Sequence, residues 1–405
     1  MSLFDKYNQV NARHDRLVAA GRDPFNVCMD RIVSATEAIV DGREVILVGT
    51  NNYLGLTFDP DCIESTVEAI RREGTGTTGS RIANGTYASH RALEQEIAAF
   101  LGRRSAMVFP TGYQANLGVI AGLAGPKDTI LLDSDSHASI YDGCRLSGAT
   151  LIRFRHNSPA DLDKRLERLK DDSSSKLVIV EGIYSMLGDQ APLDEFVDVK
   201  RRHPGVELLV DEAHSLGVFG DNGRGIAEAY GVEKDVDYVV GTFSKSLGAV
   251  GGFGASDNPE FEQLRFTSRP YMFTASSSPS SVATAMATLS KIKSQPQLRK
   301  QLWENARALY KGLSDLGFPI CAAASPIIAV KLPSEEAAVF MWNALFSAGV
   351  YVNLALPPGT PDGSCLLRCS LSAAHTPAQV QRVCEVFDQA YRALKVWRDT
   401  QSAAE

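Results

Sequence analysis

Five short apolar runs in the middle of the chain constrain its fold more than any other feature. Continuous apolar runs of this length, with room for a helix between one run and the next, are typical of parallel strands buried on both faces of a sheet. The runs are TILLDSD at 129–135, TLIRF at 150–154, KLVIVEG at 176–182, ELLVDEA at 207–213 and DYVVGTF at 237–243. The sequence therefore predicts an α/β fold with a mostly parallel central sheet flanked by helices.

The length of the chain predicts more than one domain. Its 405 residues exceed the roughly 250 to 300 at which a single core stops growing. After the last apolar run, a helical stripe begins at Leu298 and stops at Gly317, and the capping pattern TPAQ at 376–379 begins a final helix. We expect an N-terminal segment at 1–50, a large domain at 51–290 and a small C-terminal domain at 291–405.

Charge and composition exclude several classes of protein. The 41 basic and 48 acidic residues are spread along the chain and give a net charge of -7, which argues against a nucleic-acid partner. The seven cysteines include no C-x-x-C pair, which favours free thiols in a reducing compartment. The N-terminus has no apolar signal core, and Ser, Thr, Ala and Pro dominate the longest charge-free stretch, at 270–290. We expect a soluble cytoplasmic protein without a transmembrane segment.

Three short motifs resemble sites that their context does not support. The glycines of GTGTTGS at 74–80 match a dinucleotide-binding pattern, but the segment before them is typical of a helix and not of a strand. The DEAH at 211–214 matches the acidic motif of some helicases. The chain contains no Gly-Lys dipeptide, however, so it has no nucleotide-binding loop to accompany that motif. Asp133, Asp135 and His137 alternate like metal ligands, but no second cluster completes a coordination shell, so we expect a hydrogen-bonded strand end and no metal.

Polar residues gather just after the predicted strands. In open α/β sheets, ligands bind outside the carboxyl ends of the strands, so side chains placed there are expected to meet in one site. The residues in question are His137, Glu181, Asp211, His214, Thr242 and Lys245.

Lys245 and Asp211 together suggest a cofactor. A lysine among small and hydroxyl residues, as in GTFSKSLGAVGGFG, can lose its proton and form a Schiff base with an aldehyde. A carboxylate at the end of the preceding strand can pair with a pyridinium nitrogen. Pyridoxal 5'-phosphate explains both residues, and the helix start at 111–113 offers N–H groups to its phosphate.

Each of these residues also has a purely structural interpretation. Lys245 would then be a surface lysine, and Asp211 a helix cap. A lone histidine is more often a satisfied core residue than a proton carrier, although two histidines at successive strand ends are a stronger signal. Arg368, among apolar neighbours in CLLRCS, needs an anionic partner, which is a substrate carboxylate or an internal salt bridge.

The ordered motifs resemble those of the α-oxoamine synthases, which are fold-type-I pyridoxal phosphate enzymes that condense an amino acid with an acyl thioester. The resemblance covers nearly the whole chain. It runs from NNYLGL at 51–56 through GTGTTGSRIANGT, TGYQANLG, DSDSHASIYDG, EGIYSMLGDQAPL, DEAHSLGVFGDNGRG and GTFSKSLG to LLRCSLSAAHT. Four stretches look most like the soluble bacterial members that use L-serine and a long-chain acyl thioester: HASIYDG, the Leu187 of YSMLGD, the Phe-Ser of GTFSKS and PPGTP at 357–361.

The resemblance implies a fold, a reaction and a set of roles. The fold is similar to that of aspartate aminotransferase, with a large sheet domain and a smaller C-terminal α+β domain. The reaction joins L-serine to palmitoyl-CoA, or to an acyl carrier protein thioester, and gives 3-ketodihydrosphingosine, carbon dioxide and a free thiol in the first step of sphingolipid synthesis. Lys245 would bind the cofactor and remove the Cα proton, Asp211 and His214 would hold the ring nitrogen and ring oxygen, and His137 would stack on the ring and donate to the thioester oxygen.

The resemblance assigns the remaining positions to phosphate, to a partner subunit and to substrate. Phosphate would be held by Gly112, Tyr113, Thr242 and Ser244. Thr274 and Ala275 would reach into the site of a second subunit, so that a homodimer shares its two active sites. Asn52 and Arg368 would bind the substrate carboxylate, and Ser80 and Ser185 would line the pocket.

Several alternatives stay open from the sequence. Close bacterial relatives carry Arg immediately before the proline loop, whereas this chain has Leu356, so glycine or alanine competes with serine as the substrate. A non-catalytic homologous subunit and an aminotransferase are the alternatives of other kinds. The hydrophobic product also suggests peripheral contact with a membrane.

Overall fold

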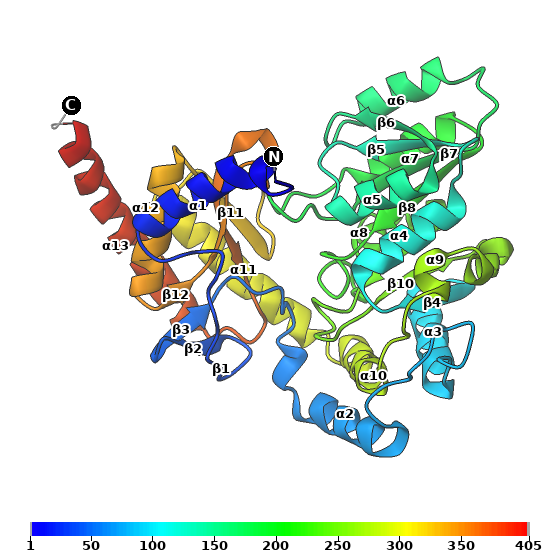
Figure 1. Ribbon diagram of the computed structural model, residues 1–405, viewed down its shortest axis with the longest axis horizontal. Helices are drawn as coiled ribbons and strands as arrows, with labels where there is room; N and C mark the ends of the chain where they lie inside the picture. Colours follow the sequence, from blue (N-terminus) through cyan, green and yellow to red (C-terminus); the bar gives the residue numbers. More distant parts are fainter. Residues whose placement is uncertain (1, 403–405) are drawn as a thin grey trace. The chain divides into compact units, whose positions relative to one another are not determined.

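The computed structural model describes residues 2–402, and Figure 1 shows them as two compact units. The larger unit comprises residues 51–185 and 189–300. The smaller unit comprises the chain up to Thr50, residues 186–188 and the chain from Gln301 onward. The three-part division at residues 50 and 290 stays a prediction.

A seven-stranded sheet forms the centre of the larger unit, with the strand order β4-β10-β9-β8-β7-β5-β6. The five apolar runs are five of its strands, and all of them pair in parallel. Their bounds are β5 Thr129–Asp133, β6 Thr150–Phe154, β7 Lys176–Glu181, β8 Val206–Asp211 and β9 Tyr238–Thr242. The predicted parallel sheet is therefore confirmed, but the expected burial on both faces is wrong for β6, which lies at the edge of the sheet with only Phe154 buried.

The remaining two strands, β4 (Ser105–Phe109) and β10 (Gly252–Ser256), complete one edge of the sheet. Strand β10 runs antiparallel to both of its neighbours, β4 and β9. It carries two glycines because helix α4 (Gly112–Leu123) approaches its backbone closely. A Cβ atom on Gly252 would lie 2.6 Å from the Cα of Gly112, and one on Gly254 would lie 2.5 Å from Cγ2 of Val119.

Helices cover the sheet, and contacts pair α4 with α5, α6 with α7, and α2 with α10. Helix α2 occupies the segment before the glycine motif, as predicted; Asp59 caps its start, and Gly74, with a φ of +82°, ends it. The glycines at 74–79 therefore follow a helix, which excludes the dinucleotide-binding interpretation. The helices of this unit are α2 Pro60–Glu73, α3 Ala88–Leu101, α4 Gly112–Leu123, α5 Ala138–Ser147, α6 Pro159–Arg168, α7 Leu193–Arg202, α8 Ile226–Ala229, α9 Arg269–Met272 and α10 Pro279–Ser294.

The core of the larger unit lies between the sheet and helices α4 and α5. Its members are apolar side chains that are almost entirely removed from water, which is the main stabilising contribution to the fold. They include Phe109, Val119, Ile120, Ile130, Leu132, Ile140, Ile179, Leu209 and Val240. This packing fixes the carboxyl ends of β7, β8 and β9 relative to the start of α4.

The smaller unit contains two sheets, with the orders β1-β2-β3-β12 and β11-β14-β13. The predicted helix before Gly317 is α11 (Gln297–Asp315). The predicted capping box is present, since Thr376 Oγ1 accepts the N–H of Gln379 at 3.2 Å and Gln379 Oε1 accepts the N–H of Thr376 at 3.0 Å. The remaining elements are α1 Asn8–Ala19, β1 Arg31–Ile32, β2 Glu37–Val40, β3 Arg43–Leu47, α12 Glu335–Ser347, β11 Ile327–Leu332, β12 Val350–Tyr351, β13 Asn353–Ala355, β14 Cys365–Ser370 and α13 Pro377–Ser402.

None of the helices within residues 2–402 combines the length and the apolar character that a membrane crossing requires. Helix α10 begins within the charge-free stretch noted in the sequence, is rich in Ser, Thr and Ala, and carries Lys291 and Lys293 in its last turn.

Candidate active site

A cavity of about 280 Å³ lies where β7, β8 and β9 end and α4 begins. The structure brings together here eight of the predicted cofactor residues, which come from four different segments of the larger unit. These are Gly112, Tyr113, His137, Asp211, His214, Thr242, Ser244 and Lys245. Asn116, Ser139 and Glu181 also line the cavity.

The start of α4 forms one wall of the cavity. Thr111 is its N-cap and accepts the N–H of Gln114 through Oγ1. The N–H groups of Gly112 and Tyr113 stand in the first turn, where a helix offers them no acceptor of its own. A Cβ atom on Gly112 would lie 2.6 Å from Cβ of Thr242, so only glycine lets the backbone come this close to the hydroxyl. Such a cradle of N–H and O–H groups suits a phosphate.

Asp211 ends β8 and is 4 % exposed. Its Oδ2 accepts a hydrogen bond from Nδ2 of Asn116 at 2.7 Å, and its Oδ1 accepts the N–H of Ala213 at 2.8 Å. Asn116 also donates to Oγ of Ser139 at 3.0 Å. These contacts hold the carboxylate at one wall of the cavity.

Glu181 is a second carboxyl group in the same cavity. It ends β7 opposite Asp211 in the parallel register and is 3 % exposed. Burial, followed by the charge of Asp211, raises the pKa of Glu181 well above its usual range. One of its oxygens accepts the backbone N–H of His137. The surroundings of Glu181 therefore favour its neutral form, and its carboxyl group helps to place His137.

His137 is the N-cap of α5 and faces the cavity. Its Nδ1 accepts the N–H of Ser139 at 3.2 Å and lies 2.7 Å from Oγ of the same residue. The surrounding protein lowers the pKa of His137, and the charge of Lys245 lowers it further, against the opposing charge of Asp211. His137 is therefore a neutral imidazole whose proton lies on Nε2, because Nδ1 acts as an acceptor.

Lys245 also lines a second cavity, of about 390 Å³, together with Asn52 and the hydroxyl groups of Thr57, Thr66, Ser280, Ser281 and Thr284. Asn52 donates from Nδ2 to Oγ1 of Thr57 at 2.8 Å. Its Oδ1 is buried and has no hydrogen-bond partner among the described residues. Lys245 thus borders both the cavity that contains Asp211 and the one that contains Asn52.

Five predicted site residues do not line either cavity. Thr274 accepts a long bond from Nε2 of Gln114 at 3.4 Å, and Ala275 is exposed at the surface. Ser80 lies in a loop, where its carbonyl oxygen accepts the N–H groups of Ala83 and Gly85. Ser185 follows β7 in the larger unit. Arg368 lies in β14 of the smaller unit, where it is 6 % exposed and donates to Oγ of Ser370 at 2.8 Å.

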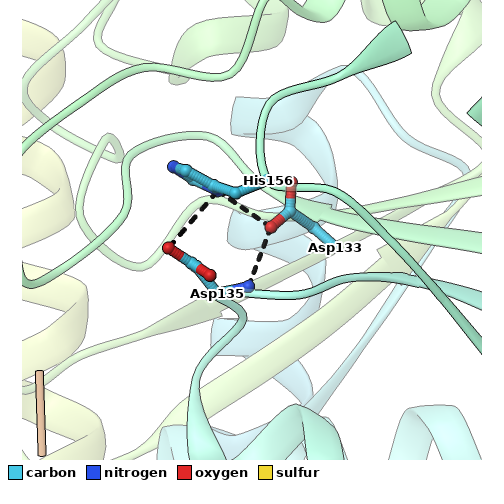
Figure 2. Close-up of side chains that lie close together, drawn as sticks. All are labelled: Asp133, Asp135 and His156. Atoms are coloured by element: carbon cyan, nitrogen blue, oxygen red, sulfur yellow. Dashed lines mark hydrogen bonds and ion pairs between the residues drawn. The ribbon is translucent and has the colours of Figure 1, made fainter. Parts of the chain in front are cut away.

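The alternating acidic motif forms a hydrogen-bonded strand end, as expected, but with a different histidine. Figure 2 shows that His156, and not His137, joins Asp133 and Asp135. The two ring nitrogens of His156 lie 2.9 Å from Oδ1 of Asp133 and 2.7 Å from Oδ2 of Asp189. Burial lowers the pKa of His156, but these carboxylates outweigh burial and raise it to about 10.

Comparison with known proteins identifies the family to which the chain belongs. The family model for class I and II aminotransferases matches residues 43–387. The serine palmitoyltransferase of Caulobacter vibrioides is 56% identical over 396 residues, which are 98% of each chain. The serine palmitoyltransferase of Sphingomonas paucimobilis is 52% identical, over 97% of this chain and 94% of that protein. The chain therefore belongs to the serine palmitoyltransferases within the class I and II aminotransferase family.

A solved structure supports the same relationship. A high-resolution structure of SPT with PLP as an internal aldimine has a TM-score of 0.95 and 51% sequence identity, and it covers 98% of this chain and 100% of that one. The predicted fold class and the predicted resemblance to the α-oxoamine synthases are confirmed. The roles of the individual site residues stay predictions.

Proposed function

We propose that this chain is a pyridoxal phosphate enzyme that condenses L-serine with a long-chain acyl thioester, palmitoyl-CoA, with release of carbon dioxide. The products are 3-ketodihydrosphingosine and the free thiol. The observation that carries the proposal is the convergence of Lys245, Asp211 and His137 on one cavity, in a chain that is 56% identical to a serine palmitoyltransferase over 98% of its length.

The residues of the cavity fit the cofactor. The N–H groups of Gly112 and Tyr113 with the hydroxyls of Thr242 and Ser244 form a cradle for its phosphate. Asp211, fixed by two donors, provides the negative charge that a pyridinium nitrogen requires. When bound, pyridoxal phosphate supplies an electron sink for negative charge that develops at the Cα of an amino acid.

Three side chains carry the proton transfers and the charge. Lys245 accepts the Cα proton of serine at Nζ, because it borders both the cofactor cavity and the cavity with Asn52. His137 donates from Nε2 to the thioester oxygen, since its Nδ1 is held by Ser139. Asp211, held by Asn116 and the N–H of Ala213, faces the ring nitrogen of the cofactor.

The substrate contacts are also part of the proposal. Asn52, whose Oδ1 is buried without a partner among the described residues, and Arg368 bind serine, and Ser80 and Ser185 line the pocket. Thr274 and Ala275 act in the site of a partner subunit, so the enzyme is a homodimer that shares its active sites. The neighbouring Phe273 is 71% exposed in the single chain. An aromatic side chain this exposed supports a surface that a partner subunit covers. We place the enzyme in the cytoplasm.

The test is a product assay by mass spectrometry. The purified holoenzyme receives palmitoyl-CoA with L-serine, glycine or L-alanine, and the ketone products are measured together with carbon dioxide. The proposal predicts that serine gives the highest kcat/KM despite Leu356. A preference for glycine or alanine overturns the choice of serine, and absence of any product overturns the enzymatic function. A parallel reaction with palmitoyl acyl carrier protein identifies the thiol carrier.

A further inference from the structure

Tyr53 contacts His214, one of the histidines at the cavity. Tyr53 is completely buried, and His214 is 6 % exposed. The hydroxyl of Tyr53 lies 2.7 Å from Nδ1 of His214, and the two rings meet edge-on at a centroid distance of 6.1 Å. The same hydroxyl lies 3.3 Å from Oδ1 of Asn51. All three residues belong to the larger unit.

The two distances favour one position for the single hydroxyl proton of Tyr53. A hydroxyl donor normally stands about 2.7 to 2.8 Å from its acceptor, whereas an N–H donor normally stands about 2.9 to 3.0 Å away. The 2.7 Å contact is therefore typical of Tyr53 donating to Nδ1 of His214. The 3.3 Å contact to Asn51 is long for a hydroxyl donor.

An acceptor at Nδ1 determines the form of the imidazole. A neutral histidine carries one ring proton, and the nitrogen that accepts a hydrogen bond is the one without it. The proton of His214 then lies on Nε2. His214 lines the cavity, so this histidine presents a hydrogen-bond donor and not an acceptor to a ligand oxygen.

We propose that Tyr53 is a positioning residue that holds His214 as the Nε2–H tautomer, so that His214 donates to the ring oxygen of the cofactor. The inference rests on the proposed function, because that function places His214 at the ring oxygen. Tyr53 itself does not line the cavity and acts only through His214. Buried hydrogen-bond networks of this kind fix one arrangement of a site.

Nitrogen-15 NMR of the full-length holoenzyme with labelled histidine tests the inference directly. The chemical shifts of Nδ1 and Nε2 distinguish the two tautomers, and the His214 signals are assigned with His214→Gln. We expect wild-type His214 to have an unprotonated Nδ1 and a protonated Nε2. A protonated Nδ1 in the wild type overturns the inference, and this measurement needs no Tyr53 variant.

The variant Tyr53→Phe removes only the hydroxyl. We expect the His214 shifts to move toward a mixture of tautomers, the pH titration of the cofactor absorbance band to shift, and kcat to fall by about fivefold, the effect of one net hydrogen bond, with KM for serine nearly unchanged. Unchanged shifts and an unchanged absorbance titration overturn the inference.

Tyr141→Phe is the matched control. Tyr141 donates to the carbonyl of Ser134 at the same distance of 2.7 Å, and it does not line the cavity. We expect it to leave the His214 shifts and the absorbance titration as in the wild type, and an equal change in both variants overturns the inference. A wild-type enzyme that forms no product overturns the proposed function, whereas the nitrogen shifts decide the inference whatever the result of the product assay.

Discussion

Asp211 and Glu181 stand opposite each other at the ends of two neighbouring parallel strands, and only Asp211 is held by two donors. A neighbouring carboxylate disfavours the charged form of a buried carboxyl group, whereas hydrogen-bond donors favour it. Asn116 and the N–H of Ala213 give that advantage to Asp211. Burial and the charge of Asp211 raise the pKa of Glu181 and so favour its neutral form.

Glu181→Gln should therefore be tolerated, because glutamine reproduces a neutral carboxyl group in shape and in its acceptor oxygen. We expect kcat within about twofold of the wild type, whereas Asp211→Asn should lower kcat by about a hundredfold or more. The measurement is steady-state kinetics with serine and palmitoyl-CoA. A loss in Glu181→Gln as large as that in Asp211→Asn would show that Glu181 works in its charged form.

The same pair predicts a dependence of stability on pH. Because folding raises the pKa of Glu181, its contribution to stability is complete below the ordinary value and is lost as the pH rises toward the folded value. The free energy of unfolding of the wild type should thus fall more between pH 5 and pH 8 than that of Glu181→Gln. Urea unfolding at both pH values checks this. Parallel pH profiles for the two proteins would contradict it.

His156 is expected to stabilise the larger unit through its charge. Removing it in His156→Gln leaves the buried Asp133 without its cation, which should cost about 3 kcal/mol of unfolding free energy at pH 7. Folding raises the pKa of His156, so its contribution is present below the ordinary value of a histidine and is lost as the pH rises through about 10.

Urea unfolding from pH 7 to pH 10 measures the effect, and the difference between wild type and His156→Gln should shrink along this range. His203→Gln is the control, because its partner Asp163 is 40% exposed and the pair contributes little. Equal losses in the two variants would mean that burial of the partner carboxylate does not matter.

Shared active sites predict complementation between two inactive variants. Lys245→Ala lacks the catalytic lysine, and Thr274→Glu places a negative charge where the partner's phosphate is expected. In a mixed dimer, one site combines Lys245 of one chain with Thr274 of the other. Random reassembly should restore about one quarter of wild-type activity per site. The assay follows product formation after the two proteins are unfolded and refolded together; no recovery would indicate sites built from one chain.

The sequence predicts the parallel strands better than the other elements. Strands β5, β7, β8 and β9 are continuous apolar runs because both of their faces are buried, and such runs are visible without a structure. Strand β6 lies at the edge of the sheet, and only its Phe154 is buried. Strand β10 has no such run, since Gly252 and Gly254 make room for α4. Its pairing depends on the close approach of a helix, which no local pattern encodes.

The location of the site was predictable from the sequence, as the parallel strands were. Lys245, Asp211 and His137 stand at strand ends, where the rule for open sheets places ligands. Asn116 and Tyr53 were not predicted, because each lies on a segment with its own structural role and reaches the site only through tertiary packing. Their presence in the motifs TGYQANLG and NNYLGL was the only signal. His156 was missed for the same reason, since it lies 21 residues after Asp135 in the chain.

Lys245 is the residue on which the whole account depends, and its attachment to the cofactor can be measured directly. The holoenzyme is reduced with borohydride, digested and mapped by mass spectrometry, with Lys311→Ala as a control in which only an exposed lysine is lost. We expect one modified peptide, containing Lys245, in both the wild type and the control, and none in Lys245→Ala. Modification of a different lysine, or of none, would contradict it.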